Sequence, residues 1–435
     1  MKNTRQILYI TLFYSLALIL TGLLAGSPRE SFAGLLAIVQ SPAQLTIDFF
    51  KVGTVGGTFL NSGLVGLACT LLLWCSRAAL SGTSLMAYFL TVGFSFFGIN
   101  AVNIWPCFLG VWLFTRLTRQ PFSAQVNVAL FSTALSPFVS EALCRYPAFD
   151  ALPAAMLWRI GLALVLGVVI GFLLPILCSH GPNLHRGYSL YNAASVAGFI
   201  GIVLFSIMYR AAGFEIPTNT DIGDSFPVVV NVFALTTSAL MLLAGFLMNG
   251  RSFSGYGKLL RSTGYRCDFT QSDGVPLTLI NLGLFGLFTT GYYNLVGASF
   301  TGPTAGSIVC LLAIAPCGTH ILTMLPIMLG YAAASAVCAF SLDTQAIVVG
   351  LCFAGALSPI AGRFGSLSGI VAGVLHACLV TTVATFHGGF CLYNGGFTSG
   401  VTAIVLVPVL EYFFTPRDRL ALLPQRKQRA FSEKP

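Results

Sequence analysis

Long apolar runs without charged residues recur along the whole chain, from Leu8 to Phe414, and they restrict its fold more than any other feature. A helix needs roughly 20 apolar residues to cross the hydrocarbon core of a bilayer. Stretches of about ten residues that alternate between polar and apolar, as in membrane β-barrels, do not occur. The sequence therefore predicts an all-α protein, a polytopic transmembrane helical bundle.

The apolar runs predict about fourteen spans, given the length that a bilayer requires. In the first half the expected spans are 6–26, 54–76, 79–98, 103–118, 124–140, 155–178 and 189–209. In the second half they are 227–249, 275–295, 300–318, 321–341, 344–360, 365–386 and 390–413. Two of them, 124–140 and 344–360, are short and contain Ser-Pro, so each either spans or re-enters the membrane.

Composition agrees with a membrane protein. Of the 435 residues, 56% are hydrophobic and 8% are charged, whereas soluble domains carry about 25% charged residues. The net charge of +9 comes from basic residues in short loops and in the C-terminal tail, as the positive-inside rule requires, so we expect no nucleic-acid partner. The cysteines form no CxxC pair and no Cys/His cluster, which predicts free thiols, no metal and no cofactor.

Short motifs that occur twice, in the same order, indicate an internal duplication. The matched segments are 60–67 with 280–287, 134–137 with 356–359, and 185–192 with 387–394. The first span also has a weak counterpart in 227–249. We therefore interpret 1–26 as a retained span and not as a cleavable signal peptide.

The duplication and the charges divide the chain into four regions. These are 1–210, the first transmembrane repeat; 211–226, an acidic external linker; 227–414, the second transmembrane repeat; and 415–435, a basic cytoplasmic tail. Basic residues at the N-terminus, in loop 250–272 and in the tail place these parts inside. We therefore expect a multi-pass protein of the cell membrane with both termini cytoplasmic.

The number of spans per repeat decides how the two repeats are oriented. Seven spans in each give two seven-span repeats of inverted topology, about a pseudo-two-fold axis in the membrane plane. If both Ser-Pro segments re-enter, the repeats run parallel instead and the acidic linker lies inside. The charge distribution favours the inverted arrangement.

Ionisable side chains are almost absent from the expected spans, and no Asp or Glu lies in the middle of one. We therefore expect no proton or sodium pump that uses carboxylates. The chain contains no HExxH, no P-loop and no GxSxG with a plausible acid partner, so we expect no enzyme.

The polar groups expected at membrane depth are amides, hydroxyls and imidazoles. The candidate solute-binding residues are Tyr191, Asn192, Tyr393, Asn394, His185, His387, Asn100, His320, His376, Ser136 and Ser358. The two Leu-Tyr-Asn motifs come first, because each follows a break with Gly and His and opens a span. A helix start offers free backbone amides and the positive end of the helix dipole. In the alternative interpretation each Asn caps its helix and each Tyr belongs to the interfacial aromatic belt.

The other candidates carry a similar pair of interpretations. Asn100 and His320 lie in corresponding tight turns. Each residue either has a structural role in its turn or acts as a gate or as a ligand-binding group. Ser136 and Ser358 precede prolines that break a helix and free backbone carbonyls. His376 stands alone in the middle of a span, either as a functional group or as a neutral His bonded to a neighbouring helix.

At the paired Leu-Tyr-Asn motifs the chain resembles the bacterial membrane family catalogued as domain of unknown function 1576, over nearly its whole length. This resemblance implies a fold and no substrate. The motifs are also similar to those of urea transporters, although Tyr191–Gly198 departs from their Tyr-Asn-x-x-Leu-x-Gly element. The plan is also similar to that of seven-plus-seven inverted-repeat nucleobase and anion transporters, which implies a site at 79–98 and 300–318. The carboxylates of the nucleobase carriers are missing.

From these features we expect an integral membrane transporter or facilitator that moves a small polar or anionic solute through a site between two inverted repeats. The alternative is a membrane-embedded enzyme or scaffold that acts on a lipid-linked substrate. The expected partners are the lipid bilayer and a small-molecule solute, with a homo-oligomer left open. A transporter requires Asn192 and Asn394 to approach one central cavity from opposite faces.

Overall fold

The computed structural model describes residues 2–218 and 223–414, and within these ranges the chain forms helices and turns without any β-strand. The helices of the first half are α1 (Lys2–Leu24), α2 (Pro28–Val39), α3 (Phe49–Ser76), α4 (Gly82–Phe94), α5 (Trp105–Leu117), α6 (Val126–Ser132), α7 (Pro137–Cys144), α8 (Ala155–Cys178), α9 (Gly181–Leu184) and α10 (Asn192–Phe205), which continues as the π-helical turn η4 (Ser206–Ala211). Those of the second half are α11 (Pro227–Met248), α12 (Tyr256–Leu259), α13 (Phe269–Ser272), α14 (Val275–Leu295), α15 (Gly302–Leu312), α16 (Ile321–Ser335), α17 (Gln345–Ala354), α18 (Ser358–Phe364), α19 (Ser366–Phe386) and α20 (Asn394–Phe413). The predicted all-α class is confirmed.

The described residues contain 9 helices that are long and apolar enough to cross a membrane, or up to 10 if one bent pair counts as a single span. The bent pair is 126–135 with 137–149, at an angle of 46° across the first Ser-Pro. The second Ser-Pro segment, 345–364, forms one apolar helix of 20 residues. Each of the expected segments contains a helix, but α4, α5, α15 and α16 have only 11 to 15 residues. The count of fourteen spans is therefore not confirmed.

Helices at corresponding positions of the two halves pack in corresponding pairs. In the first half α1 packs on α3 and α5 packs on α8; in the second, α11 packs on α14 and α16 packs on α19. The α5–α8 contact passes through Gly110 and Gly171, and the α16–α19 contact passes through Gly330 and Gly373. Small residues at these crossings let the backbones approach closely, as is usual between membrane helices.

One buried asparagine in each half stabilises the end of a short helix. The Asn61 side chain of α3 donates to the carbonyls of Ser95 and Ile99, both at 2.9 Å. Asn281 of α14 makes the corresponding bonds, and its acceptors are Ala315 (3.0 Å) and Thr319 (2.9 Å). These carbonyls follow α4 and α15, where the helical bonding ends, so the two amides pair groups that the break would leave unsatisfied.

Two aspartates join the halves. Asp48 accepts a bond from the amide of Phe50 at the start of α3 (2.9 Å) and another from Gly302 at the start of α15 (2.8 Å). Asp268 makes the corresponding bonds from the second half; its donors are the amides of Thr270 (3.0 Å) and Gly82 (3.0 Å). Each carboxylate therefore caps one helix of its own half and one helix of the other half.

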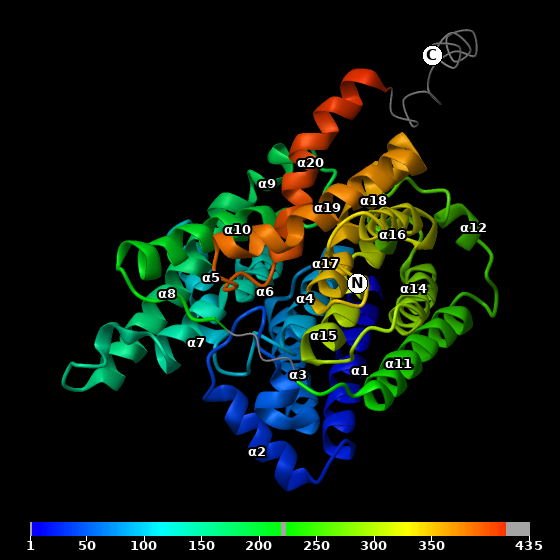
Figure 1. Cartoon of the computed structure of the whole chain (residues 1–435). Helices are drawn as coiled ribbons and strands as arrows, with labels where there is room; N and C mark the ends of the chain where they lie inside the picture. Colours follow the sequence, from blue (N-terminus) through cyan, green and yellow to red (C-terminus); the bar gives the residue numbers. More distant parts are fainter. Residues whose placement is uncertain (1, 219–222, 415–435) are drawn as a thin grey trace.

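The halves also interlock through their helices, since α15 packs against α4 and α20 packs against α10 (Figure 1). At the first crossing a Cβ at Gly306 would lie 2.3 Å from the carbonyl oxygen of Gly93, so no larger residue fits there. The two repeats consequently form one bundle and not two separate domains.

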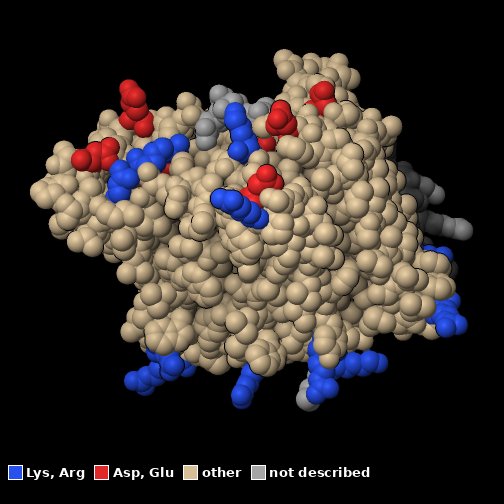
Figure 2. Space-filling model, turned by 90° about the horizontal axis from the view of Figure 1, so that it is seen from below, with Lys and Arg blue, Asp and Glu red and all other residues tan. Residues whose placement is uncertain are grey.

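The loops gather on two opposite faces. The basic face comprises the start of α1 and the loops 77–81, 179–190 and 250–272. It is held together by bonds from Asn3 to the carbonyl of Thr270 (3.1 Å) and from the Tyr265 hydroxyl to the carbonyl of Arg186 (3.0 Å). Figure 2 shows basic side chains alone along one edge of the molecule, and acidic side chains with some basic ones along the opposite edge, which we call the mixed face. A broad uncharged belt separates the two edges, as a bilayer requires.

Candidate functional site

The two Leu-Tyr-Asn motifs meet in the centre of the bundle. The rings of Tyr191 and Tyr393 are both buried, and their centroids lie 6.4 Å apart. The backbone contacts around them are reciprocal: the amide of Leu190 donates to the carbonyl of Ala356 (3.1 Å), and the amide of Leu392 donates to that of Ala134 (3.0 Å). Corresponding segments of the two halves therefore contact each other in the same way at the centre of the bundle.

The helices that start at this contact lead to opposite faces. From Asn192, α10 and η4 lead to Tyr209, which donates a hydrogen bond to Glu141 near the mixed face. From Asn394, α20 leads to Glu411, which is paired with Arg186 of the basic face. The loops before the two helix starts therefore enter the bundle from opposite faces.

A cavity of about 320 Å³ lies against the two tyrosines on the side of the basic face. Its wall includes Tyr191, Tyr393 and the exposed Asn192 at the start of α10, together with Ser189 and the loop residue Arg266. Among the described residues no Asp or Glu lines it. Three of the four Tyr and Asn residues predicted from the motifs thus share one cavity. The fourth, Asn394, does not reach it, so the expectation that both asparagines approach one central cavity is not met in this conformation.

Asn394 is buried and fully engaged in the second half. Its side-chain oxygen contacts Nε2 of His387 at 3.2 Å, and its side-chain nitrogen donates to the carbonyl of Val380 at 2.9 Å. Nδ1 of His387 accepts from the amide of Cys391 at 3.4 Å. Burial lowers the pKa of His387 to about 4, so the ring is neutral at pH 7. Because Nδ1 is an acceptor, the single ring proton is on Nε2 and points at Asn394.

The corresponding pair in the first half is open. Nδ1 of His185 accepts from the amide of Ser189 at 3.3 Å, so the ring has the same placement as that of His387. Burial lowers the pKa of His185 to about 4 as well. Its buried Nε2, however, has no partner among the described residues, because Asn192 faces the cavity instead. The inherited His–Asn pair is therefore made in one repeat and broken in the other.

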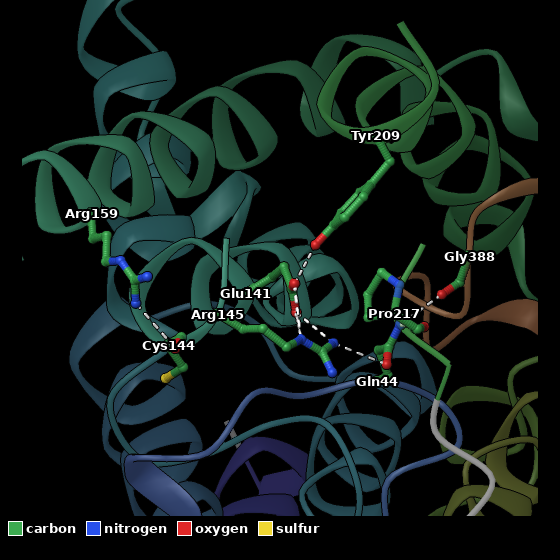
Figure 3. Close-up of polar contacts among 8 residues, drawn as sticks. All are labelled: Gln44, Glu141, Cys144, Arg145, Arg159, Tyr209, Pro217 and Gly388. Carbon is green, nitrogen blue, oxygen red and sulfur yellow. Dashed lines mark hydrogen bonds and ion pairs between the residues drawn. The ribbon is translucent and has the colours of Figure 1, made fainter. Parts of the chain in front are cut away.

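The loop before Asn394 is closed by a polar network. The Gln44 side chain donates to the carbonyl of Gly388 at 2.9 Å, and Arg145 donates to Gln44 at 3.1 Å (Figure 3). Arg145 in turn pairs with Glu141 at 2.7 Å. Figure 3 shows Gln44 between Arg145 and Gly388, so the network links α7 to the 387–390 loop.

Glu141 corrects one expectation from the sequence. We expected no carboxylate within a span, but Glu141 is fully buried in α7, in the second part of the bent pair. The expected span, 124–140, ended one residue before Glu141. The chain instead bends at Ser136-Pro137 and continues as a helix, which brings the next turn, and Glu141 with it, into the bundle.

The second repeat has no counterpart of Gln44. Gly264 precedes Asp268 by the same spacing as Gln44 precedes Asp48, and a glycine offers no side chain to hold the 185–190 loop. That loop is held instead at its outer part, where Arg363 donates to the Tyr188 hydroxyl at 2.8 Å. Gln44 thus bonds the 387–390 loop, and the 185–190 loop, beside which the cavity lies, lacks the corresponding side chain. In the sequence, this difference between the halves could be found by comparing the residues at the same spacing before Asp48 and Asp268, which are Gln44 and Gly264.

The remaining candidates lie outside this cavity. The two ring nitrogens of His376 contact the Tyr331 hydroxyl (2.7 Å) and the carbonyl of Gly395 (2.8 Å). The Asn100 side chain accepts the amides of its own turn. These contacts fit the structural interpretation of both residues.

The last three candidates are His320, Ser358 and Ser136. Nε2 of His320 contacts the carbonyl of Ser262 at 3.0 Å. The Ser358 hydroxyl bonds that of Thr319 at 2.7 Å, and the buried Ser136 hydroxyl has no partner among the described residues. None of these residues belongs to the cavity wall.

Within the described ranges, no group of three or more His, Cys, Asp or Glu residues is arranged to hold a metal ion.

Apolar helices of spanning length around a polar centre define an integral, multi-pass helical membrane protein. The chain belongs to the family described as Protein of unknown function (DUF1576), whose model matches residues 27–210 and 248–412. The expected resemblance is thereby confirmed. Neither the curated proteins nor the solved structures contain a match.

Proposed function

We propose that the protein is a transporter or facilitator that moves a small polar or anionic solute through a site between two inverted repeats. The observation that carries this proposal is the His–Asn pair. It is closed between His387 and Asn394 (3.2 Å) and open between His185 and Asn192, and the cavity lies at the open pair.

Such a difference between corresponding residues is what alternating access requires. In an inverted repeat, the two halves exchange their conformations to turn a central site from one face to the other. The closed pair then opens as the open pair closes, and a new cavity forms on the mixed face. The reciprocal backbone bonds of Leu190 and Leu392 support this exchange. Each bond is the counterpart of the other, so the contact between the two halves at the centre is the same after they exchange conformations.

The two states are expected to have similar energies. In each state one imidazole N–H is paired with an asparagine and the other has no protein partner, so the exchange makes one hydrogen bond and breaks one. A small energy difference lets a solute that binds one state shift the population. Asn192 therefore binds solute when the pair is open and closes the path when the solute has left.

The charge distribution supports an orientation with the basic face in the cytoplasm. The start of α1 lies on this face, and α20 leads toward it through the contact of Glu411 with Arg186. The positive-inside rule then makes both termini cytoplasmic and the cavity open to the cytoplasm. The enzyme alternative depended on His376, and both nitrogens of that ring are used in helix packing.

Uptake into proteoliposomes tests the proposal. The vesicles are incubated with a mixture of small carboxylates, their neutral amides and small polyols, and the retained solutes are measured by mass spectrometry. We expect at least one solute to accumulate above protein-free vesicles and to be lost in Asn192→Ala. Asn231→Ala, at a half-buried asparagine of α11 that pairs with Asn294 outside the cavity, is the control and keeps full uptake. If no solute is retained above the protein-free level, the proposal is wrong.

A further inference from the structure

We infer that the cavity at the start of α10 binds a small oxyanion of the carboxylate type. Backbone amides and hydroxyls hold it at the base of the cavity, and Arg266 attracts it at the mouth. The inference rests on the proposed function and names the class of solute for the same site.

The first element of the site is the start of α10. The amides of Asn192 and Ala193 find no acceptor in the described part of the chain, and both residues line the cavity. In the second repeat the corresponding amide of Asn394 donates to the carbonyl of Cys391 at 3.2 Å. The open repeat thus presents free N–H groups and the positive end of a helix dipole to the cavity, which is a favourable place for an anion.

The second, independent element is a pair of buried hydroxyls. Tyr191 and Ser189 line the cavity, are only 2% and 1% exposed, and their oxygens have no hydrogen-bond partner among the described residues. A buried hydroxyl without a partner is destabilising and is rare in native proteins. Two of them beside a helix start indicate a ligand that supplies hydrogen-bond acceptors.

The third element is the charge at the mouth. Arg266 lines the cavity, and its guanidinium lies over the Tyr265 ring at 5.3 Å. No described carboxylate pairs with Arg266. Three other arginines, Arg145, Arg159 and Arg186, each pair with an acid of their own. Asp268 does not line the cavity, and its oxygens accept from the amides of Gly82 and Thr270.

These groups specify the ligand by their hydrogen-bonding capacity. Amides and a guanidinium only donate, so the ligand must accept, and the positive charge with no lining acid favours an anion. The volume of about 320 Å³ is at the lower end of the roughly 300–1,000 Å³ of ligand pockets. A compact carboxylate fits these requirements, and the phosphate of an anionic lipid headgroup shares its chemistry.

Thermal unfolding of the purified full-length protein in a neutral detergent tests the inference. The additives are acetate, lactate and succinate, each compared with its neutral amide at a constant ionic strength set by chloride, and phosphatidylglycerol in a separate arm. We expect at least one carboxylate to raise the midpoint in a saturable way, while its amide does not. If the amide stabilises as well as the acid, or if no anion stabilises, the inference is wrong.

Two variants locate the effect. Removing a hydrogen bond to a charged ligand weakens binding by about tenfold or more, so Tyr191→Phe should raise the apparent Kd by at least that factor. Arg266→Gln should raise it several-fold, and more at low salt. Arg251→Gln is the matched control, because Arg251 belongs to the same loop and has a similar positive φ (57° against 51°) but lies outside the cavity. Each midpoint shift is taken relative to the same variant without additive, so a change in basal stability does not obscure the result.

The arms also separate this inference from the proposed function. Stabilisation by phosphatidylglycerol alone supports the anion site and contradicts transport of a free solute. Uptake of neutral solutes as rapid as that of their acids supports transport and overturns the anion site. An unchanged affinity in Tyr191→Phe overturns the inference in either case.

Discussion

Corresponding residues of the two repeats have different environments at this site. Asn192 is exposed in the cavity and has no side-chain hydrogen bond to the described residues, whereas Asn394 is buried and bonds both His387 and the carbonyl of Val380. Sequence alone placed both residues at helix starts, because Gly and His precede each motif. It did not distinguish them, since the difference depends on Gln44, which is far away in the chain and reaches Gly388 only in the folded protein.

The two asparagines should therefore respond differently to the same substitution. Asn394→Ala leaves a buried imidazole N–H and a buried carbonyl unpaired, which should cost about 1–3 kcal/mol of stability. Asn192→Ala removes no bond to the protein and should leave stability within about 0.5 kcal/mol of the wild type. Thermal unfolding of both variants in the same detergent measures the difference. Equal losses would mean that the two residues have equivalent surroundings.

At the level of the elements, the sequence predicted which segments are helical but not how long they are. The apolar run 79–98 continues past Phe94, where α4 ends, because the turn that follows is apolar too. Its carbonyls are paired by Asn61, so the helix can stop inside the bundle without unsatisfied groups. Such a partner comes from another helix and cannot be read from local periodicity. For the same reason, local periodicity did not predict that the chain continues as a helix past the Ser-Pro bend and buries Glu141.

The crossing of α4 and α15 offers a test of helix packing. In Gly306→Ala the new Cβ would lie 2.3 Å from the carbonyl oxygen of Gly93, so the helices must separate. Overpacking of this kind should cost about 1–3 kcal/mol. Gly291→Ala in α14 is the control, because a Cβ there meets nothing within 4 Å and alanine favours the helix. Stability that falls equally in both variants, or in neither, would contradict the close crossing.

The Gln44 network should determine which face is closed. Gln44→Ala removes the donor to the Gly388 carbonyl, so the 387–390 loop should open more often. Native Cys391, which is fully buried beside His387, then becomes a reporter. With the other cysteines replaced, we expect its reaction with an impermeant maleimide to accelerate about tenfold in Gln44→Ala, which corresponds to about 1.4 kcal/mol. Gln40→Ala, at the end of α2, should leave the rate unchanged, and an equal rate in all three proteins would rule out the Gln44 clamp.

On the scale of the whole molecule, the charges and the duplicated motifs determine one arrangement. Basic side chains alone occupy one edge, and acids with some basic groups occupy the other (Figure 2). The helices of the two halves interlock between these edges. The all-α class was predictable, because it depends on patterns along the chain. The asymmetry between the halves was not, since it arises from the exchange of Gln44 for Gly264 and its effect on distant loops.

The accessibility of one corresponding pair, Ser189 and Cys391, tests alternating access most directly. In a protein without other cysteines, Ser189→Cys and native Cys391 are probed separately with an impermeant maleimide in vesicles of known orientation. We predict that a cysteine at position 189 reacts from the basic face through the cavity, and that Cys391 reacts more slowly and from the mixed face. When both are present, a bulky maleimide on the first should hold the cavity open and protect the second. Reaction of both from the same face, or a Cys391 rate that is unaffected by the first modification, would contradict the account.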